Sequence, residues 1–365
     1  MKHVLLTTLL FVFSQAFQAQ NYRFLVGTYT NTGKSQGIYS YEMNMKTGSI
    51  VQKSVATGVS NPSFLCVTPD KKWVYSVNES TDGSAANAFS FDAKTGKLTY
   101  LNRSLTLGKG PCSIAATKDH VFTANYGGGS VSVFSRESDG SLSDLKQKIQ
   151  HEGSSVNLNR QAEPHVHQVL VSNDKRFVFT NDLGTDQVIA YRYQPQSDTE
   201  ILIPWDTLTV KKGSGPRHSV FSRDGKKVYL VQELDGTVSV MDFKKDKLKL
   251  MQETTILKEP DQKGWAADIH FSPDGKFLYA TNRAPANNIT CFWVLKDGRL
   301  EFLSQVSTRG DGPRNFAITP DGKYLLVAHQ FSNNIVVFQR DKKTGFLTDT
   351  GERIDVGAPV CLLFY

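Results

Sequence analysis

The sequence has little cysteine, and no two cysteines lie close together. Only four of the 365 residues are cysteine, at positions 66, 112, 291 and 361. None belongs to a CxxC pair, so a zinc site of that kind is not indicated. Each cysteine lies among apolar, strand-like neighbours. We therefore expect buried free thiols, although the spacing alone leaves a disulfide open.

No apolar run is long enough to span a membrane. The longest, Val4 to Phe13, is interrupted by two threonines, follows a short basic start and precedes small residues at Ser14, Ala16 and Ala19. This order is typical of a secretory signal peptide, and the run is shorter than a transmembrane helix requires. We expect a signal peptide at residues 1–20 and a mature protein, residues 21–365, that is periplasmic or secreted.

Linkers, charge blocks and cofactor motifs are also missing. No stretch rich in proline, serine and glycine divides the chain, and the formal charge of +7 is spread over lysine-rich turns. No stripe of aromatic and arginine residues points to nucleic acid, and there is no GxGxxG motif. The sequence therefore predicts one monomeric domain with no cofactor and no nucleic-acid partner.

What the sequence does contain is an internal repeat. The clearest copies begin at Gly215, Ala266 and Gly312, and weaker ones begin at Asn61, Gly110 and Glu163. Each copy has an apolar strand, a tight turn of the Pro-Asp-Gly-Lys type and further alternating strands, with no sustained helical periodicity. A repeat of roughly 46 to 53 residues with four strands per copy is typical of a β-propeller.

The two ends of the chain complete this repeat. The C-terminal segment APVCLLFY resembles a lone first strand, and YRFLVGTYTN, GIYSYEMN and SIVQKS resemble strands two to four. We predict an all-β, seven-bladed propeller with four antiparallel strands per blade. Its ring is closed by the N-terminal strands together with the C-terminal strand.

The repeat also predicts which residues meet at one end of the channel. The first strand of each blade lines the channel, and its start lies on the same face as the end of the antiparallel second strand. Seven residues before the turn aspartate stand Ser63, Cys112, His167, Arg217, Ala267 and Arg314. The next position holds Phe64, Ser113, Gln168, His218, Asp268 and Asn315. The second strands end near Glu79, Tyr126, Asp182, Glu233 and Arg283.

Arginines beside histidines and carboxylates indicate an anion-binding site with a base available. The alternative is that these groups are only solvated or paired with one another in a water-filled channel. Four residues before the turn aspartate, the repeat copies have Cys66, Ala115, Leu170, Val220, His270 and Ala317, so that His270 is the single polar residue at this position. For His270, the alternative to a role in the site is that it is a buried structural histidine.

Two further patterns carry less weight. Gly33 to Gly37 match GxSxG but lie between two expected strands, where no nucleophile elbow forms. His165 and His167 could bind a metal, but no third ligand is evident, so we expect no metal site.

Several segments resemble the seven-bladed lactonase family, which includes the bacterial propeller-type 6-phosphogluconolactonase and is similar to carboxymuconate lactonizing enzyme. They include GTYTNTGKSQGIY (27–39), PHVHQV (164–169), GPRHSVF (215–221), WAADIHFSPDG (265–275) and GPRNFAITPDG (312–322). The resemblance covers essentially the whole mature chain. It implies catalytic residues at His167, Arg217, Glu233 and Arg314. His165, Asp182, His218, Asp268, His270 and Arg283 are the substrate-binding candidates.

The expected reaction is attack of water on a lactone carbonyl. Arg217 and Arg314 would stabilise the oxyanion, and His167 or Glu233 would take the proton from water. Because the chain is expected to be exported, an unphosphorylated sugar lactone fits better than a sugar phosphate. The alternatives are a non-catalytic binding propeller and a muconate-type lactonizing lyase.

Overall fold

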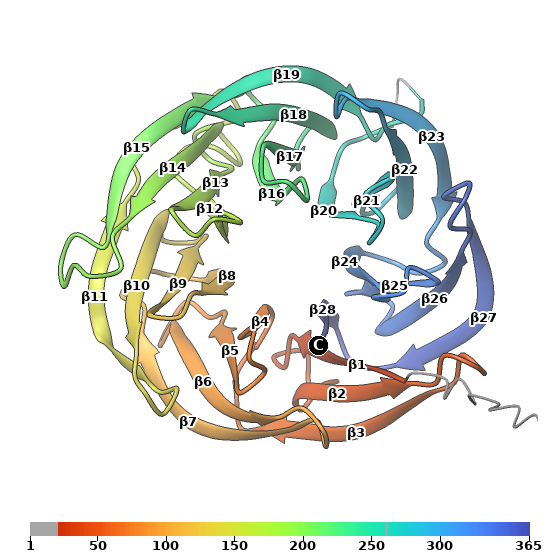
Figure 1. The fold of residues 1–365 in the computed structure, drawn as a ribbon, viewed down its shortest axis with the longest axis horizontal. Coiled ribbons are helices and arrows are strands. Elements are labelled where there is room, and N and C mark those ends of the chain that lie inside the picture. Colours follow the sequence, from red (N-terminus) through yellow and green to blue (C-terminus); the bar gives the residue numbers. More distant parts are fainter. Residues whose placement is uncertain (1–20, 260–261) are drawn as a thin grey trace, which may run out of the picture.

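The structure is a computed structural model that describes residues 21–259 and 262–365. The predicted signal peptide lies outside these residues. The regular secondary structure of the described residues is entirely β-strand and forms seven four-stranded antiparallel sheets arranged in a ring (Figure 1). The described chain contains no helix long and apolar enough to cross a membrane.

Each sheet is one blade, and its four strands lie side by side, with the innermost strand at the centre of the ring and the fourth at the outside. The closing blade contains β28 (Pro359–Phe364), β1 (Tyr22–Thr28), β2 (Gly37–Met43) and β3 (Ile50–Thr57). The next two contain β4 (Leu65–Val67), β5 (Trp73–Asn78), β6 (Ala85–Asp92) and β7 (Lys97–Leu105), then β8 (Pro111–Ala116), β9 (His120–Asn125), β10 (Ser130–Arg136) and β11 (Leu142–Gln150). Two more contain β12 (Val166–Val171), β13 (Phe177–Asp182), β14 (Gln187–Tyr193) and β15 (Leu202–Thr209), then β16 (Pro216–Phe221), β17 (Lys227–Gln232), β18 (Thr237–Lys244) and β19 (Lys247–Thr255). The last two contain β20 (Ala266–Phe271), β21 (Phe277–Asn282), β22 (Asn288–Val294) and β23 (Leu300–Ser307), then β24 (Pro313–Ile318), β25 (Tyr324–His329), β26 (Asn334–Arg340) and β27 (Leu347–Asp355).

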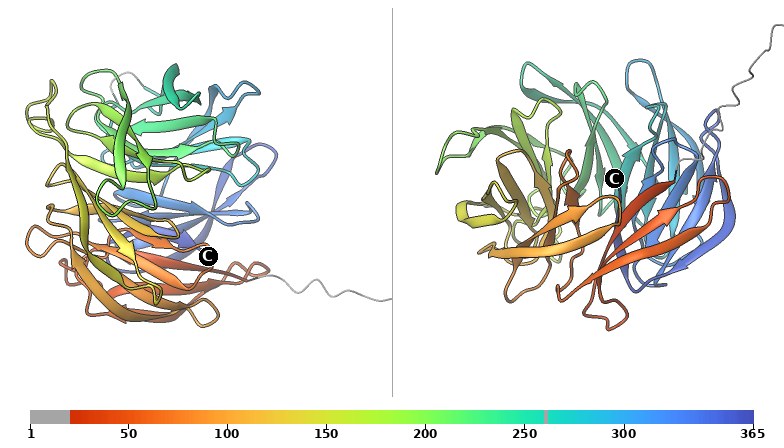
Figure 2. Two further views of the ribbon diagram at one scale, coloured as in Figure 1. Left: turned by 60° about the vertical axis from the view of Figure 1, so that its left-hand side comes forward. Right: turned by 60° about the horizontal axis from the view of Figure 1, so that its bottom comes forward.

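The ring closes as the sequence predicts. β28 pairs antiparallel with β1, so that Phe24 lies opposite Phe364 and Leu25 opposite Leu363. The two ends of the chain therefore share one blade, as the tilted views also show (Figure 2). Seven blades of four strands confirm the predicted architecture.

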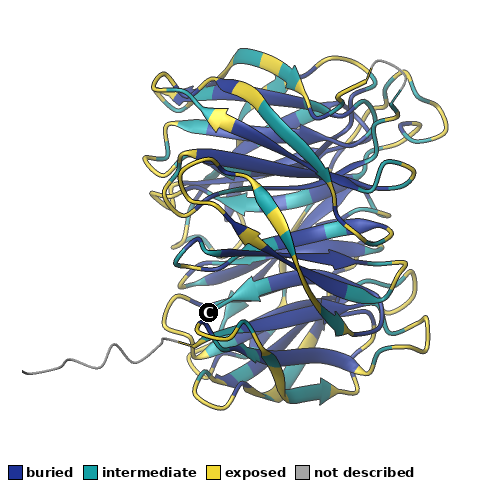
Figure 3. Cartoon of the chain, turned by 90° about the vertical axis from the view of Figure 1, so that its right-hand side faces the viewer, coloured by how far each residue is buried: buried dark blue, intermediate teal, exposed yellow. Residues whose placement is uncertain are grey.

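The core lies between neighbouring blades. The buried apolar side chains of the described residues form seven clusters, and each cluster joins two adjacent sheets. Burial is concentrated in the strands, and exposed residues gather in the connecting loops (Figure 3). Polar contacts also link blades; for example, the Tyr279 hydroxyl donates a 2.7 Å hydrogen bond to the Gly345 carbonyl. Because each blade buries its faces against two others, the ring is stabilised as a unit.

The four cysteines are all free thiols. Cys112, Cys291 and Cys361 are buried, as the sequence predicts, whereas Cys66 is half-buried. Cys66 lies in β4, a strand of only three residues in which Val67 is partly exposed as well.

A β-bulge recurs at the start of the inner strands. Val166 lies opposite Asp182 and Gln168 opposite Asn181, which leaves His167 as an extra, unpaired residue. The same shift occurs around Cys112, Arg217 and Arg314. A bulge bends its strand and re-aims the extra side chain. These are the residues that the repeat places seven positions before the turn aspartate.

Candidate active site

Two adjoining cavities lie where the bulges converge. The larger, which we call the main pocket, has a volume of about 260 Å³ and is lined by Tyr29, Glu79, Cys112, Tyr126, Arg160, His167, Glu233, Trp265, Arg283 and Arg314. The smaller, which we call the small cavity, has a volume of about 10 Å³ and is lined by Ser63, Phe64, Glu79, Cys112, His167, Arg217, His218, Arg314 and Val360. The four predicted catalytic residues therefore all line one cavity or both.

Glu233 holds three arginines around one carboxylate. Its Oε1 accepts a 2.6 Å hydrogen bond from Arg160 Nη2, and its Oε2 accepts one of 2.8 Å from Arg217 Nε. Arg283 Nη2 lies 2.9 Å from the same Oε2. Burial alone would raise the pKa of Glu233, but Arg283, Arg217 and Arg160 outweigh it and hold that pKa well below its ordinary value. Glu233 is therefore a structural anion and a poor proton acceptor.

Arg314 differs from the other arginines of the site. Within residues 21–259 and 262–365 its guanidinium makes no hydrogen bond or ion pair, and it lies 5.5 Å from the centre of the Tyr29 ring. The Tyr29 hydroxyl instead donates to Glu79 Oε1 at 2.8 Å. The two cavities contain four arginines and two glutamates, so positive charge is in excess. An anion, or an oxygen that becomes one, is the ligand that Arg314 suits.

His167 is a neutral imidazole between the two cavities. Its ring packs edge-on against Tyr126 at 5.4 Å and against His218 at 5.2 Å between ring centres. Burial, and then the charges of Arg217 and other cations, lower the pKa of His167 well below its ordinary value of 6.5. No carboxylate contacts this imidazole among the described residues.

His218, in contrast, is paired with a carboxylate. His218 Nδ1 lies 2.8 Å from Asp268 Oδ1, and both side chains are buried. The other oxygen, Oδ2, accepts hydrogen bonds from His270 Nε2 at 2.9 Å and from Asn315 Nδ2 at 2.6 Å. Residues of three inner strands, β16, β20 and β24, are thus connected beside the small cavity. His270 lines neither cavity, and 43% of its side chain is exposed.

The structure places four of the six predicted substrate-binding residues outside both cavities: His165, Asp182, Asp268 and His270. His165 stacks on Tyr126 with ring centres 4.5 Å apart, and its Nδ1 donates to the Tyr126 carbonyl at 3.0 Å. Asp182 is completely buried and accepts hydrogen bonds from His165 N at 2.8 Å and His151 Nδ1 at 2.7 Å. These contacts give Asp182 a structural position: it holds both ends of the segment 151–165, which we call the 151–165 loop.

That loop supplies the residue that sequence reasoning missed most clearly. Arg160 reaches the main pocket from the 151–165 loop and contacts both Glu233 and the Tyr126 hydroxyl, the latter at 3.2 Å. The sequence feature that could have revealed Arg160 is the length of the connection between β11 and β12, residues 151–165. The corresponding connection between β7 and β8 consists of residues 106–110 alone. Glu79 and Tyr126 directly follow β5 and β9, as Glu233 follows β17. They therefore belong to the set of residues that the sequence places near the ends of the second strands.

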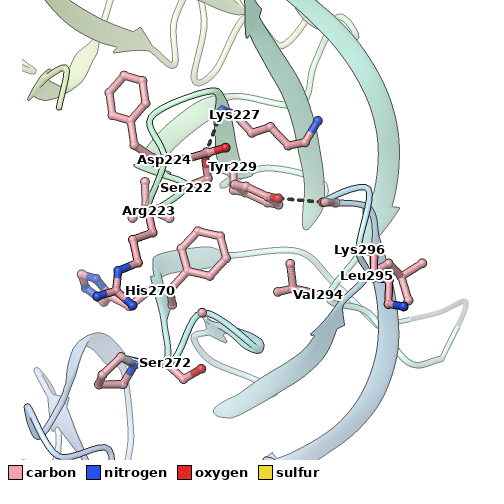
Figure 4. Close-up of a pocket in the computed structure, with 16 residues that line it drawn as sticks. Ser222, Arg223, Asp224, Lys227, Tyr229, His270, Ser272, Val294, Leu295 and Lys296 are labelled. Atoms are coloured by element: carbon pink, nitrogen blue, oxygen red, sulfur yellow. Dashed lines mark hydrogen bonds between the residues drawn. The ribbon is translucent and has the colours of Figure 1, made fainter. Parts of the chain in front are cut away.

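A larger pocket elsewhere does not fit the predicted chemistry. It has a volume of about 540 Å³ and lies between the turn that joins β16 to β17 and the elements around β20 to β23. Figure 4 shows Ser222, Arg223 and Asp224 of that turn with His270 at one side. His270 is the only predicted site residue that lines this pocket, so we assign the candidate active site to the main pocket and the small cavity.

No set of three His, Cys, Asp or Glu side chains suited to a metal ion occurs in the part of the chain that the structure describes. The two cavities are lined by guanidinium, imidazole, carboxylate, hydroxyl and thiol groups and by aromatic rings.

Comparison with protein families shows which proteins this chain is similar to. The model of the family described as "Lactonase, 7-bladed beta-propeller" matches residues 23–364. The 6-phosphogluconolactonase of Formosa agariphila is 36% identical over 348 residues, which cover 93% of this chain and 98% of that protein. The 6-phosphogluconolactonase of Bacillus subtilis is 31% identical over 345 residues, covering 93% and 97%.

A solved structure extends the similarity to three dimensions. The periplasmic gluconolactonase of Pseudomonas aeruginosa superimposes with a TM-score of 0.90 at 35% sequence identity, and the match covers 94% of this chain and 99% of that one.

Proposed function

This chain belongs to the seven-bladed β-propeller lactonase family, and from that membership and its pocket we propose that it hydrolyses an unphosphorylated aldonolactone outside the cytoplasm. The family makes it a lactone hydrolase of the 6-phosphogluconolactonase type. The substrate, the compartment and the roles of individual residues are the proposal.

The observation that carries this proposal is Arg314, which has no hydrogen-bond or ion-pair partner among the described residues and lines the same cavities as a neutral His167. Hydrolysis of a lactone begins when water adds to the carbonyl carbon and charge develops on the carbonyl oxygen. A preorganised, desolvated donor at that oxygen contributes about 10²–10³ in rate in other acyl-transfer enzymes. Arg314 is available for this role because no described residue forms a hydrogen bond or ion pair with its guanidinium, which lies 5.5 Å from the centre of the Tyr29 ring. Arg160, Arg217 and Arg283 surround the same space but are tied to Glu233.

The attacking water would be bound by an imidazole rather than by Glu233. Three arginines stabilise the Glu233 anion, so its carboxylate is a weak base. His167 lines both cavities and is buried in its neutral form, which leaves a nitrogen lone pair available for water. We therefore assign Glu233 the role of orienting arginines.

The substrate class follows from the compartment. The N-terminal pattern predicts export, and a periplasmic gluconolactonase is a structural relative. Lactones of unphosphorylated sugar acids occur outside the cytoplasm, whereas sugar phosphates are kept inside it. The excess positive charge suits the carboxylate product as well as the oxyanion.

The proposal is tested by pH-stat titration of purified residues 21–365 with glucono-δ-lactone, its 6-phosphate and other lactones, after subtraction of spontaneous hydrolysis. We expect enzyme-dependent acid release that is fastest on an unphosphorylated aldonolactone. Preference for the 6-phosphate would overturn the substrate assignment. No rate above background on any lactone would overturn the activity and favour a binding propeller.

A further inference from the structure

His218 has one ring nitrogen without a hydrogen-bond partner in the described part of the chain. Its Nδ1 is bonded to Asp268, but its Nε2 is buried and has no hydrogen-bond partner among the described residues. Asp268 also accepts from His270, Asn315 and the Phe316 amide. A carboxylate with so many donors stays ionised, so His218 Nδ1 carries a proton and donates it. Nε2 therefore carries the lone pair.

The small cavity adjoins this imidazole and has room for one water. Its volume of about 10 Å³ is close to the lower limit for a single buried water, about 10–15 Å³. Ser63, Glu79 and His167, which all have polar side chains, line it together with His218, and a buried water needs two or more polar partners. A water there lies beside the main pocket, because both cavities share Glu79, Cys112, His167 and Arg314.

The surroundings of the two histidines decide which is the better base. The charged and titratable groups around His218 are Arg217 on its own strand, His167 on β12, Asp268 and His270 on β20, and Glu79, Cys112 and Arg314 across the small cavity. Only His218 has a buried carboxylate in direct contact, and this carboxylate stabilises an imidazolium. Burial lowers the pKa of His218 to about 4, even though Asp268 opposes the shift. His167 lacks that support.

We propose that the small cavity holds the attacking water and that His218, oriented by Asp268, is the base that takes its proton. This inference rests on the proposed lactone hydrolysis. One water proton moves to His218 Nε2 while the water oxygen bonds to the carbonyl carbon and the carbonyl electron pair moves to its oxygen beside Arg314. The bond between that carbon and the ring oxygen then breaks with its electron pair. The ring oxygen takes the proton back from His218 and becomes a hydroxyl, and the product acid ionises in solvent.

The test compares His218→Gln with wild type and with His329→Gln, a matched control. His329 is another buried imidazole, in β25, and both its nitrogens lack partners within the described chain. We expect His218→Gln to lower kcat by about 10²–10⁴ and to leave KM within threefold, whereas His329→Gln keeps the wild-type kcat. In wild type, kcat should fall on acidification with a midpoint near pH 4, the pKa to which burial lowers His218. Asp268→Asn should move that midpoint lower, since Asp268 raises the pKa.

Two outcomes overturn the inference separately from the proposed function. If wild type hydrolyses lactone and folded His218→Gln keeps kcat within threefold, the function stands and the base is wrong. Nitrogen-15 NMR of histidine-labelled wild type tests the tautomer without any variant. A His218 with its proton on Nε2 overturns the inference even if the variants fail to fold. A wild type that is inactive on every lactone overturns the proposed function, and the base with it.

Discussion

At the scale of single residues, Arg217 and Arg314 show how equivalent positions acquire different roles. Both are the extra residue of a bulge in their blades. Arg217 is 1% exposed and bound to Glu233 and to the Ala267 carbonyl. Arg314 has no such partner in the described chain. The first side chain stabilises the fold of the channel, and the second is free to act on a ligand.

Separate effects on activity and stability should follow from this difference. We expect Arg314→Ala to lower kcat/KM by about 10²–10³ with little change in the free energy of unfolding, since no ion pair is broken. Arg217→Ala should lower the free energy of unfolding by about 3–5 kcal/mol, because it leaves part of a buried ion-pair network uncompensated. Steady-state kinetics and urea denaturation of both variants check this. Equal losses of stability would contradict the assignment.

At the scale of elements, the 151–165 loop completes the main pocket, and Asp186 holds its middle while Asp182 holds its two ends. Asp186 accepts hydrogen bonds from Gln161 Nε2 at 2.8 Å and from the Gly215 amide at 2.8 Å. Ser155 Oγ and the Gly213 amide donate to its other oxygen. This carboxylate therefore ties the loop that carries Arg160 to the start of the strand that carries Arg217.

We expect Asp186→Ala to release the 151–165 loop. KM for the lactone should rise about tenfold, because misplacement of a positioning group by about 1 Å can have effects up to a hundredfold, and proteolytic cleavage within residues 151–165 should become faster. Asp246→Ala is the control, since Asp246 pairs with the exposed Arg176 and such pairs contribute about 0–1 kcal/mol. Kinetics and limited proteolysis measure both effects. Unchanged KM and cleavage in Asp186→Ala would show that the loop is held otherwise.

At the scale of the whole molecule, buried ionisable groups predict sensitivity to acid. Burial lowers the pKa of both His218 and His329 from 6.5 to about 4. The unfolded chain binds protons at these histidines below about pH 6.5 and the folded chain does not, so acidification favours unfolding in this range. The pKa values of Glu233 and Asp268 are also held low, chiefly by arginines and histidines respectively that outweigh burial. The stability from these carboxylates is lost as pH falls below their ordinary values of 4.5 and 3.8.

The expected result is a free energy of unfolding that decreases from pH 6.5 to pH 4 and more steeply below it. Urea denaturation at several pH values measures this dependence. His329→Gln should reduce the slope between pH 6.5 and 4, because one of the contributing imidazoles is removed. A slope identical to that of wild type would show that His329 is not held neutral in the folded protein.

The fold of the whole ring could be predicted because its information is local and repeated. Each Ser/Thr-x-Asp-Gly turn forms its own contacts. In one, Thr319 Oγ1 donates to Asp321 Oδ1 at 2.7 Å, and Gly322 adopts the left-handed conformation with φ of 74°. Strands that are separated by such turns form antiparallel hairpins. Because the copies at the two ends of the chain are incomplete, β28 has to pair with β1 to complete a blade. The column containing Cys112, His167, Arg217 and Arg314 was predictable for the same reason.

The sequence by itself therefore determined seven blades, the closure of the ring and the set of polar residues at its centre, because strand period and turn chemistry act over a few residues. Only the tertiary structure decided which of those residues are paired with other side chains and which remain available to a ligand. Arg314 has no ion-pair partner among the residues that the structure describes, Glu233 is enclosed by arginines, Asp182 supports a loop and His218 is hydrogen-bonded to Asp268. Several of these differences depend on contacts between blades, such as His218 with Asp268 and Arg160 with Glu233, whose residues lie 50 and 73 positions apart in the chain, and no local pattern in the sequence contains that information.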